Sequence, residues 1–269
     1  MTRTPIVLAL VMIALSTFPV QSKPLLLMAT TTTENSGFLE YIVQKIEKNT
    51  GVDLVYVAYG TGKVLRSARD GNADLVFVHD PASEKTFIEQ GYALARYPVM
   101  KNQFVIVGPN KDPARISAAT SPEEAFRRIE NTGSLFISRG DESGTHKAEQ
   151  RIWLKLKTDR QQPYPKWYLK SGSGMGRTLN IAVEKQAYTL VDNATWAAFR
   201  NKQNFTILYS GGKELENIYS FLTLPGPSRD PEKRDRLNAV MNWVLSDNFS
   251  LAVIEFSVTN QHVYTPLAK

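Results

Sequence analysis

The chain contains no cysteine, and only three of its 269 residues are histidine. Without cysteine no disulfide can form, so packing alone must hold the fold together. The histidines stand at positions 79, 146 and 262, without the short spacings that metal sites use. We therefore expect neither a metal cation nor a cofactor.

The chain also lacks, beyond its first residues, any apolar run approaching the roughly 20 residues of a membrane helix. Its N-terminus has Arg3, an apolar stretch over 6–15 and small polar residues before Lys23. This order is typical of a secretory signal, so we expect residues 1–22 to be cleaved off near Ser22; the alternative is a buried first helix. No cysteine near that point can carry a lipid anchor, which favours the periplasm of a double-membraned bacterium.

Charge of one sign is not strongly in excess. The chain has 32 basic and 26 acidic residues, a formal net charge of +6, and loss of Arg3 with the signal leaves +5. Like charges never form a run of five or more. This distribution argues against a nucleic-acid platform and suits a protein that attracts small anions.

The chain does contain a regular alternation of strand and helix patterns. The apolar run LLLMAT predicts a buried strand, and the helical pattern that follows it ends at Gly51. Alternation at this spacing implies right-handed crossovers and a mostly parallel sheet. The expected strands up to residue 91 are 25–30, 52–60 and 73–80, and the expected helices are 38–51, 64–71 and 83–91.

The second half of the chain repeats the order of strand, polar loop and helix. A proline-, glycine- and serine-rich segment at 159–176 predicts a long loop, in which SGSGMG (171–176) is interpreted as a mobile loop beside a ligand. Segment 179–192 mixes helix and strand signals. The other expected strands are 102–109, 134–139, 205–210 and 218–226. The other expected helices are 121–133 (capped by Ser121, with Glu124 completing a capping box), 146–156, 194–201 and 231–256, the last in two pieces.

These elements predict an α/β fold of two lobes rather than two independent domains. The lobes are expected to be joined by two crossing strands, near 104–108 and 219–223. Lobe I then comprises 23–104 and 219–269, and lobe II comprises 105–218.

Four threonines at 30–33 stand between a predicted strand and a predicted helix. Their hydroxyls and the free backbone N–H groups of the helix start can donate to an anion, and the helix dipole favours negative charge there. The alternative is ordinary helix capping by Thr33 or Ser36.

The stretch GTGK (60–63) also lies between a strand and a helix, but Val57 and Val64 occupy positions where a P-loop requires glycine and serine or threonine. Thr61 therefore offers either a contact to a small anion or only a turn.

The stretch SRGDESGTH places Arg139 at the end of a strand and Ser143, Gly144 and Thr145 at the start of a helix. Guanidinium, hydroxyl and backbone N–H donors together point to one tetrahedral oxyanion. The alternative is an exposed arginine beside a routine helix cap. Ser143 is not expected to act as a nucleophile, because His146 on the same helix is badly placed as its base.

Several stretches, in their order along the chain, resemble the tungstate-binding proteins of bacterial tungstate ABC importers: ATTTTENSG, YGTGK, NQFVIVGP, SRGDESGTH, WYLKSGSGMGRTLN and YTLVDNATW. The resemblance runs from about Leu25 to Gly226 and implies a type II periplasmic binding protein whose lobes close on an oxyanion. Two positions depart from the family pattern, Thr32 in place of a serine and Ser173 in place of a glutamine. The resemblance implies ligand contacts at Thr30, Thr31, Thr32, Thr61, Arg139, Ser143, Gly144 and Thr145.

The expected function is binding of tungstate or molybdate by a monomer that is not an enzyme, for delivery to the permease and ATPase subunits of an ABC importer. A lining of donors alone suits these fully ionised anions and disfavours hydrogen phosphate, whose proton needs an acceptor. Asp80 or Asp141 facing the cleft would weaken that argument. The alternatives are a phosphate- or sulfate-binding protein and an exported phosphoryl hydrolase that uses Arg139 and His79.

Overall fold

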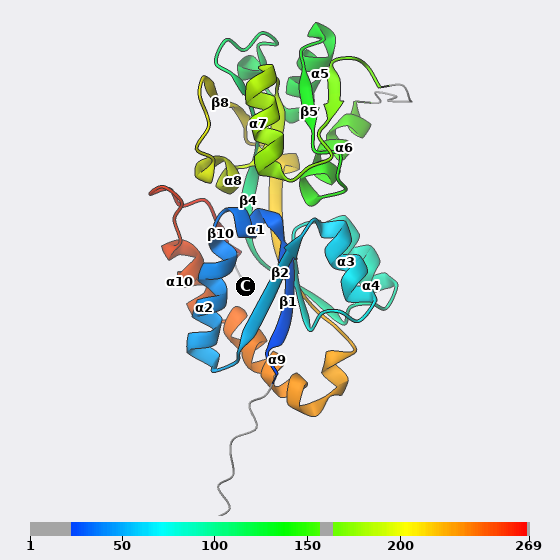
Figure 1. The fold of residues 1–269 in the computed structure, drawn as a ribbon, viewed down its shortest axis with the longest axis vertical. Helices are drawn as coiled ribbons and strands as arrows, with labels where there is room; N and C mark the ends of the chain where they lie inside the picture. Colours follow the sequence, from blue (N-terminus) through cyan, green and yellow to red (C-terminus); the bar gives the residue numbers. More distant parts are fainter. Residues whose placement is uncertain (1–22, 157–163, 268–269) are drawn as a thin grey trace, which may run out of the picture.

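The computed structural model describes residues 23–156 and 164–267, so the predicted signal at 1–22 lies outside the described residues. The described chain forms two α/β lobes stacked along the long axis of the molecule (Figure 1). Two strands, β4 (Ala95–Pro109) and β9 (Glu216–Thr223), pass between the lobes. Within the described ranges no helix is both long and apolar enough to cross a bilayer. The predicted two-lobed α/β fold is confirmed.

The sheet of lobe I, the lower lobe in Figure 1, combines parallel and antiparallel strands. Its further strands are β1 (Leu25–Thr30), β2 (Leu54–Tyr59), β3 (Leu75–Val78) and β10 (Thr265–Pro266). The order across the sheet is β10, β4, β9, β3, β1 and β2. β1 is parallel to β2 and β3, whereas β9 is antiparallel to β3 and β4.

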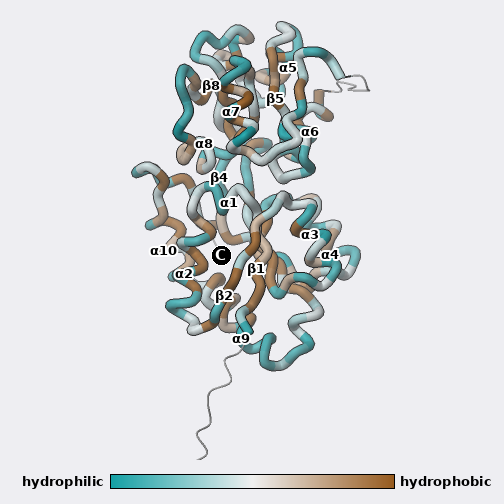
Figure 2. The backbone as a smooth tube through the Cα atoms, in the orientation of Figure 1, coloured by the Kyte–Doolittle hydropathy of each residue, from teal (hydrophilic) through white to brown (hydrophobic). Residues whose placement is uncertain are grey.

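Helices cover both faces of this sheet, because successive residues of a strand point to opposite sides. In β1, which is hydrophobic along its length (Figure 2), Leu25, Leu27 and Ala29 face one apolar cluster and Met28 faces another. The first cluster includes side chains of α2 (Phe38–Thr50), α9 (Pro231–Val244) and α10 (Asp247–Glu255). The second includes α3 (Thr61–Arg69) and α4 (Pro81–Glu89).

The predicted helices of lobe I are confirmed, with shifts at some starts. α2 begins at Phe38, and Gly51 ends it in the left-handed conformation with φ of 68°. The threonine run forms a separate short helix, α1 (Thr31–Asn35), instead of a loop. α3 begins at Thr61, three residues earlier than predicted, because Gly60 takes the extended conformation of a helix cap.

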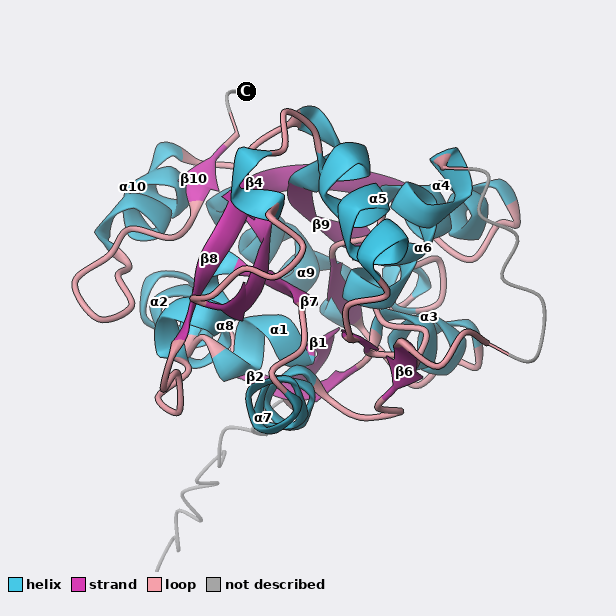
Figure 3. Ribbon diagram, turned by 90° about the horizontal axis from the view of Figure 1, so that it is seen from above, coloured by secondary structure: helices cyan, strands magenta, loops and turns pink. Residues whose placement is uncertain are grey.

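Lobe II has helices on both sides of its strands. Phe104 and Ile106 of β4 pack on α5 (Pro122–Thr132) and α6 (Gly144–Lys155), whereas Val105 and Val107 pack on α7 (Met175–Lys185). Seen from above, α5 and α6 lie apart from α7 and from α8 (Asn193–Ala198) (Figure 3). The strands that accompany β4 are β5 (Phe136–Ser138), β6 (Tyr168–Lys170), β7 (Thr189–Asp192) and β8 (Phe205–Ser210).

Two local predictions in lobe II need correction. The segment that was expected to be only a loop contains β6, which pairs in parallel with β5, and residues 157–163 lie outside the described chain. SGSGMG therefore follows β6 directly, and its last two residues already belong to α7, a context that the sequence pattern does not reveal. Ser121 caps α5 by accepting from the Glu124 N–H at 3.1 Å, but the Glu124 carboxylate accepts from Thr120 instead of Ser121.

β4 changes its partners where it passes from one lobe to the other. Up to Gln103 it pairs with β9, and from Phe104 onward it pairs with β7 and β8. Asn217 of β9 donates to Asn102 of β4 at 2.8 Å beside this change. The lobe boundaries expected from the sequence stay a prediction.

Candidate functional site

The carboxyl ends of strands from both lobes face one another. β4 runs from lobe I into lobe II, and the antiparallel pairings with β9 and then β3 orient β1, β2 and β3 the same way. β7 runs back toward lobe I, and β5 is parallel to it through the bridge between Phe136 and Tyr188. The loops that follow these strands therefore meet between the lobes, where open α/β folds bind ligands. We call this region the interlobe interface.

The two lobes touch at the interlobe interface. A Cβ atom built on Gly60 would lie 3.8 Å from Cβ of Ser143, and one built on Gly144 would lie 2.7 Å from Cε1 of His79. Gly60 and His79 follow strands of lobe I, whereas Ser143 and Gly144 begin α6 of lobe II. The structure therefore has the lobes closed on each other.

The threonine run and Ser36 behind it contain both hydrogen-bonded and unpartnered hydroxyls. Thr33 donates its hydroxyl to the Thr30 carbonyl at 2.8 Å, and Ser36 donates to the Thr33 carbonyl at 3.0 Å. Neither of these bonds caps a helix, because a cap accepts from a backbone N–H, but Ser36 Oγ does accept from the Phe38 N–H at the start of α2, at 3.3 Å. Thr30 is different, because its Oγ1 is buried and has no hydrogen-bond partner. Thr32 is buried at the same turn, and Thr31 is half-buried. The expected capping is thus limited to Ser36, whereas the buried, unpartnered Thr30 hydroxyl is the member of the run that favours an anion contact.

Lobe II contributes the start of α6 and the end of β5. Ser143 is the helix cap, with its Oγ accepting from the His146 N–H at 3.3 Å. Gly144 and Thr145 form the first helical residues, and Thr145 Oγ1 is buried without a partner. Arg139 is only 2% exposed, so the alternative of an exposed arginine is wrong.

Five buried donors at the ends of β1 and β5 and the starts of α3 and α6 have no partner in the described structure: Thr30 Oγ1, Thr61 Oγ1, Ser138 Oγ, Arg139 Nε and Thr145 Oγ1. Thr195 Oγ1, in the first turn of α8, is also buried without a partner. An unpaired buried donor costs roughly 1–3 kcal/mol, so such a group indicates a ligand or water in the working protein. Four of the five were expected from the sequence. Ser138 was missed; alternation along β5 turns it toward the same side as Phe136, which packs with α6.

Asp141 and Asp80 are already engaged by protein donors, whereas Asp192 at the end of β7 keeps its Oδ2 buried without a partner. Asp141 pairs with the Arg139 guanidinium and also accepts from the Ser143 N–H at 3.2 Å. Asp80 accepts from Arg151 at 2.7 Å and from Ser83 at 2.5 Å, and its side chain is 1% exposed. Both carboxylates are therefore bound by protein donors in this closed structure.

His79 is packed too tightly to act as an acid–base group. Its ring stacks on Tyr219 with a centroid separation of 4.8 Å, and Nδ1 is 2.7 Å from the Asn217 side-chain oxygen. Burial lowers the pKa of His79 to about 4, although the hydrogen bond to Asn217 acts in the opposite direction. His79 is thus neutral near pH 7, with Nδ1 donating to Asn217, and it forms part of the wall that Gly144 contacts.

This burial predicts a pH-dependent loss of stability. The pKa of His79 in the folded protein lies below its ordinary value of 6.5, so the unfolded chain binds more protons as the pH falls between these values. The contribution of the neutral His79 ring to the free energy of unfolding is complete above about pH 6.5, and roughly 2 kcal/mol of it should be lost by about pH 5. Denaturant unfolding at the two pH values should show this loss in the wild type and a smaller one in His79→Gln. Equal losses in both proteins would contradict the assignment.

The two glycine-rich stretches have different surroundings. Thr61 of GTGK is the first residue of α3. The ammonium of Lys63 lies 3.5 Å from the centroid of the Tyr59 ring, so this lysine already has a partner within lobe I. In SGSGMG, Ser171 donates to the Arg139 carbonyl at 3.2 Å and thus ties the start of this loop to β5.

Comparison with known proteins identifies the family. A model of the PBP superfamily domain matches residues 19–248. The tungstate-binding protein TupA of Peptoclostridium acidaminophilum is 34% identical over 244 residues, which cover 88% of this chain and 82% of the relative. TupA of Campylobacter jejuni is 33% identical over 241 residues and covers 88% of each chain.

Two solved structures have similar folds. The tungstate-binding protein TupA from Desulfovibrio alaskensis G20 has a TM-score of 0.77 at 34% identity, covering 92% of this chain and 100% of its own. The tungstate ABC transporter structure from Geobacter sulfurreducens has a TM-score of 0.77 at 35% identity, covering 87% of this chain and 99% of its own. The chain therefore belongs to the PBP superfamily and, within it, to the family of tungstate-binding proteins.

Proposed function

We propose that the chain binds a tetrahedral oxyanion, most favourably tungstate and next molybdate, between its two lobes. The observation that carries this proposal is the set of five buried, unpartnered donors beside the closed interlobe interface. An oxyanion with four acceptor oxygens would satisfy donors from both lobes at once. The proposed contacts are Thr30, Thr31, Thr32, Thr61, Arg139, Ser143, Gly144 and Thr145, to which the structure adds Ser138.

The donor set also explains a preference among anions. Each hydrogen bond to a charged group contributes roughly 1.5–3 kcal/mol net, so several of them support tight binding even after the loss of ligand and lobe freedom. Tungstate and molybdate only accept hydrogen bonds, whereas hydrogen phosphate carries a proton that needs an acceptor. Asp80 and Asp141 are bound by cations and donors, so neither carboxylate is a ready acceptor for that proton.

The relatives indicate the role of such binding. The named proteins bind tungstate or belong to a tungstate ABC transporter, so we propose delivery of the anion to the permease and ATPase of an ABC importer. A cleaved signal at 1–22 would place the chain in the periplasm, where we expect it to be a monomer. The chain is a binding protein and not an enzyme, and His79, the histidine that a phosphoryl hydrolase would use, is enclosed between Asn217, Tyr219 and Gly144.

A thermal-shift titration with four anions tests this function. At a concentration about 1,000 times the dissociation constant, a bound ligand stabilises a protein by about 4 kcal/mol, which for this size raises the melting temperature by roughly 8–16 °C. Tungstate should produce such a rise, molybdate a similar or smaller one, and phosphate and sulfate little. A larger rise with phosphate or sulfate would favour that binding class, and no rise with any anion would refute the function.

A further inference from the structure

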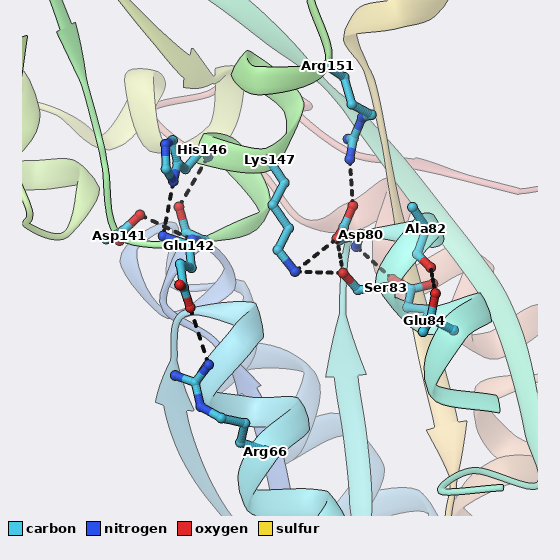
Figure 4. Close-up of polar contacts among 12 residues, drawn as sticks. Arg66, Asp80, Ala82, Ser83, Glu84, Asp141, Glu142, His146, Lys147 and Arg151 are labelled. Atoms are coloured by element: carbon cyan, nitrogen blue, oxygen red, sulfur yellow. Dashed lines mark hydrogen bonds and ion pairs between the residues drawn. The ribbon is translucent and has the colours of Figure 1, made fainter. Parts of the chain in front are cut away.

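A second set of interlobe contacts lies beside the donor cluster. Gly144, Lys147 and Arg151 are spaced by three and four residues on α6, so they form one stripe on that helix. This stripe faces the junction between β3 and α4 in lobe I. Gly144 lies against the His79 ring. Lys147 and Arg151 both pair with the Asp80 carboxylate (Figure 4).

Both cationic partners of Asp80 belong to the other lobe. Its Oδ1 accepts from Arg151 at 2.7 Å, and its Oδ2 lies 3.4 Å from the Lys147 ammonium. Lys147 also donates to the hydroxyl of Ser83 at 2.6 Å, and Ser83 donates to Asp80. The Asp80 carboxylate is 1% exposed, whereas Lys147 and Arg151 keep 32% and 48% of their side-chain surface exposed.

We propose that Asp80 is a positioning residue for oxyanion binding, which holds α6 against lobe I through Lys147 and Arg151 without touching the anion. This inference rests on the proposed function, because it names what stabilises the closed form of that same site. In this role the Asp80 carboxylate stabilises the closed form and does not serve as an acceptor for a protonated ligand.

The geometry of α6 explains how this effect reaches the anion. The helix carries the donors Ser143, Gly144 and Thr145 at its start and the two cations on its next turns, so one rigid element bears both sets of contacts. When the lobes separate, Asp80 loses both cations and returns to water. Any free energy that these ion pairs contribute to closure therefore adds to the apparent affinity for an anion that binds the closed form.

Asp80 remains ionised in this environment. Burial acts to raise the pKa of Asp80, but the hydrogen bond from Ser83 and the charges of Arg151 and Lys147 outweigh it and leave that pKa below its ordinary value. A second interlobe pair differs: Arg66 and Glu142, 3.3 Å apart, are 56% and 70% exposed. Solvent screens such a pair, so it should contribute little.

The test compares Asp80→Asn with Glu142→Gln in the full chain. Asparagine can still occupy the cap position of α4, so the variant should fold, which its melting temperature without anion will verify. We expect Asp80→Asn to weaken tungstate binding about tenfold by calorimetry. Glu142→Gln, which removes the same charge from the exposed pair, should change the affinity by less than about threefold.

A double-mutant cycle with Arg151→Gln gives the second measurement. If Arg151 acts through Asp80, the double variant should bind about as tightly as the weaker single variant, because the two residues form one interaction. Additive losses, or an Asp80→Asn affinity within about twofold of the wild type, would overturn the proposal. If wild-type protein fails to bind tungstate at all, the proposed function fails instead, so the two failures are distinguishable.

Discussion

Replacing Arg139 by alanine is expected to remove most of the rise in melting temperature that tungstate produces. Arg139 supplies the formal positive charge among the proposed contacts, and its Nε is buried without a partner. Loss of one member of a buried charge pair costs about 2–5 kcal/mol, so the affinity should fall about 30- to 4,000-fold. At about 1,000 times the wild-type dissociation constant, a loss of about 100-fold would lower the stabilisation from about 4 to about 1.4 kcal/mol.

Arg127→Ala is the matched control for this variant. Arg127 is exposed on α5, so its replacement removes the same formal charge away from the interlobe interface. The control should keep nearly the full rise in melting temperature. A full rise in Arg139→Ala as well would show that the guanidinium makes no contact with the anion.

Replacing Gly144 by alanine should weaken tungstate binding strongly while leaving the fold of the free protein intact. The new Cβ would lie 2.7 Å from Cε1 of His79, closer than two carbon atoms can approach. His79 cannot move away easily, because it is held by Asn217 and stacked on Tyr219. Overpacking of this kind costs about 1–3 kcal/mol, so the affinity should fall about 5- to 150-fold as the lobes are held apart.

Two glycines serve as controls for this steric effect. A Cβ on Gly176 in the first turn of α7 meets nothing within 4 Å, and a Cβ on Gly60 meets Ser143 at an ordinary 3.8 Å. Both alanine variants should bind within about threefold of the wild type, because neither contact costs appreciable energy. Small-angle scattering with saturating tungstate should show a more extended particle for Gly144→Ala alone. Wild-type affinity in that variant would mean that Gly144 does not approach His79 when the lobes close on the anion.

Much of the fold and most of the candidate donors could be predicted, because they depend on local patterns. The apolar run of β1 and the helix that ends at Gly51 are signals contained in neighbouring residues. Thr30, Thr61 and Thr145 follow strands or begin helices, and those positions leave backbone and hydroxyl donors free. Arg139 could be predicted for a similar reason, because it is a charged donor at the end of a predicted strand.

What could not be predicted depends on contacts between distant parts of the chain. β6 is only three residues long, and its strand character comes from pairing with β5 some thirty positions earlier. The sequence left the orientation of Asp80 open, because its partner Arg151 lies 71 positions away in the other lobe. Ser138 carried no signal either: a serine at the end of a strand is unremarkable until its hydroxyl is found buried and unpaired.

The crossing strand β4 limits how the molecule can be divided. Val99 and Met100 belong to the apolar cluster of lobe I, whereas the residues from Phe104 onward alternate between the two clusters of lobe II. One continuous strand thus supplies core side chains to both halves, so neither half is a self-sufficient module. Grafting lobe II of this chain onto lobe I of a relative would have to replace half of a strand, and the junction would fall inside a hydrogen-bonded ladder instead of in a loop.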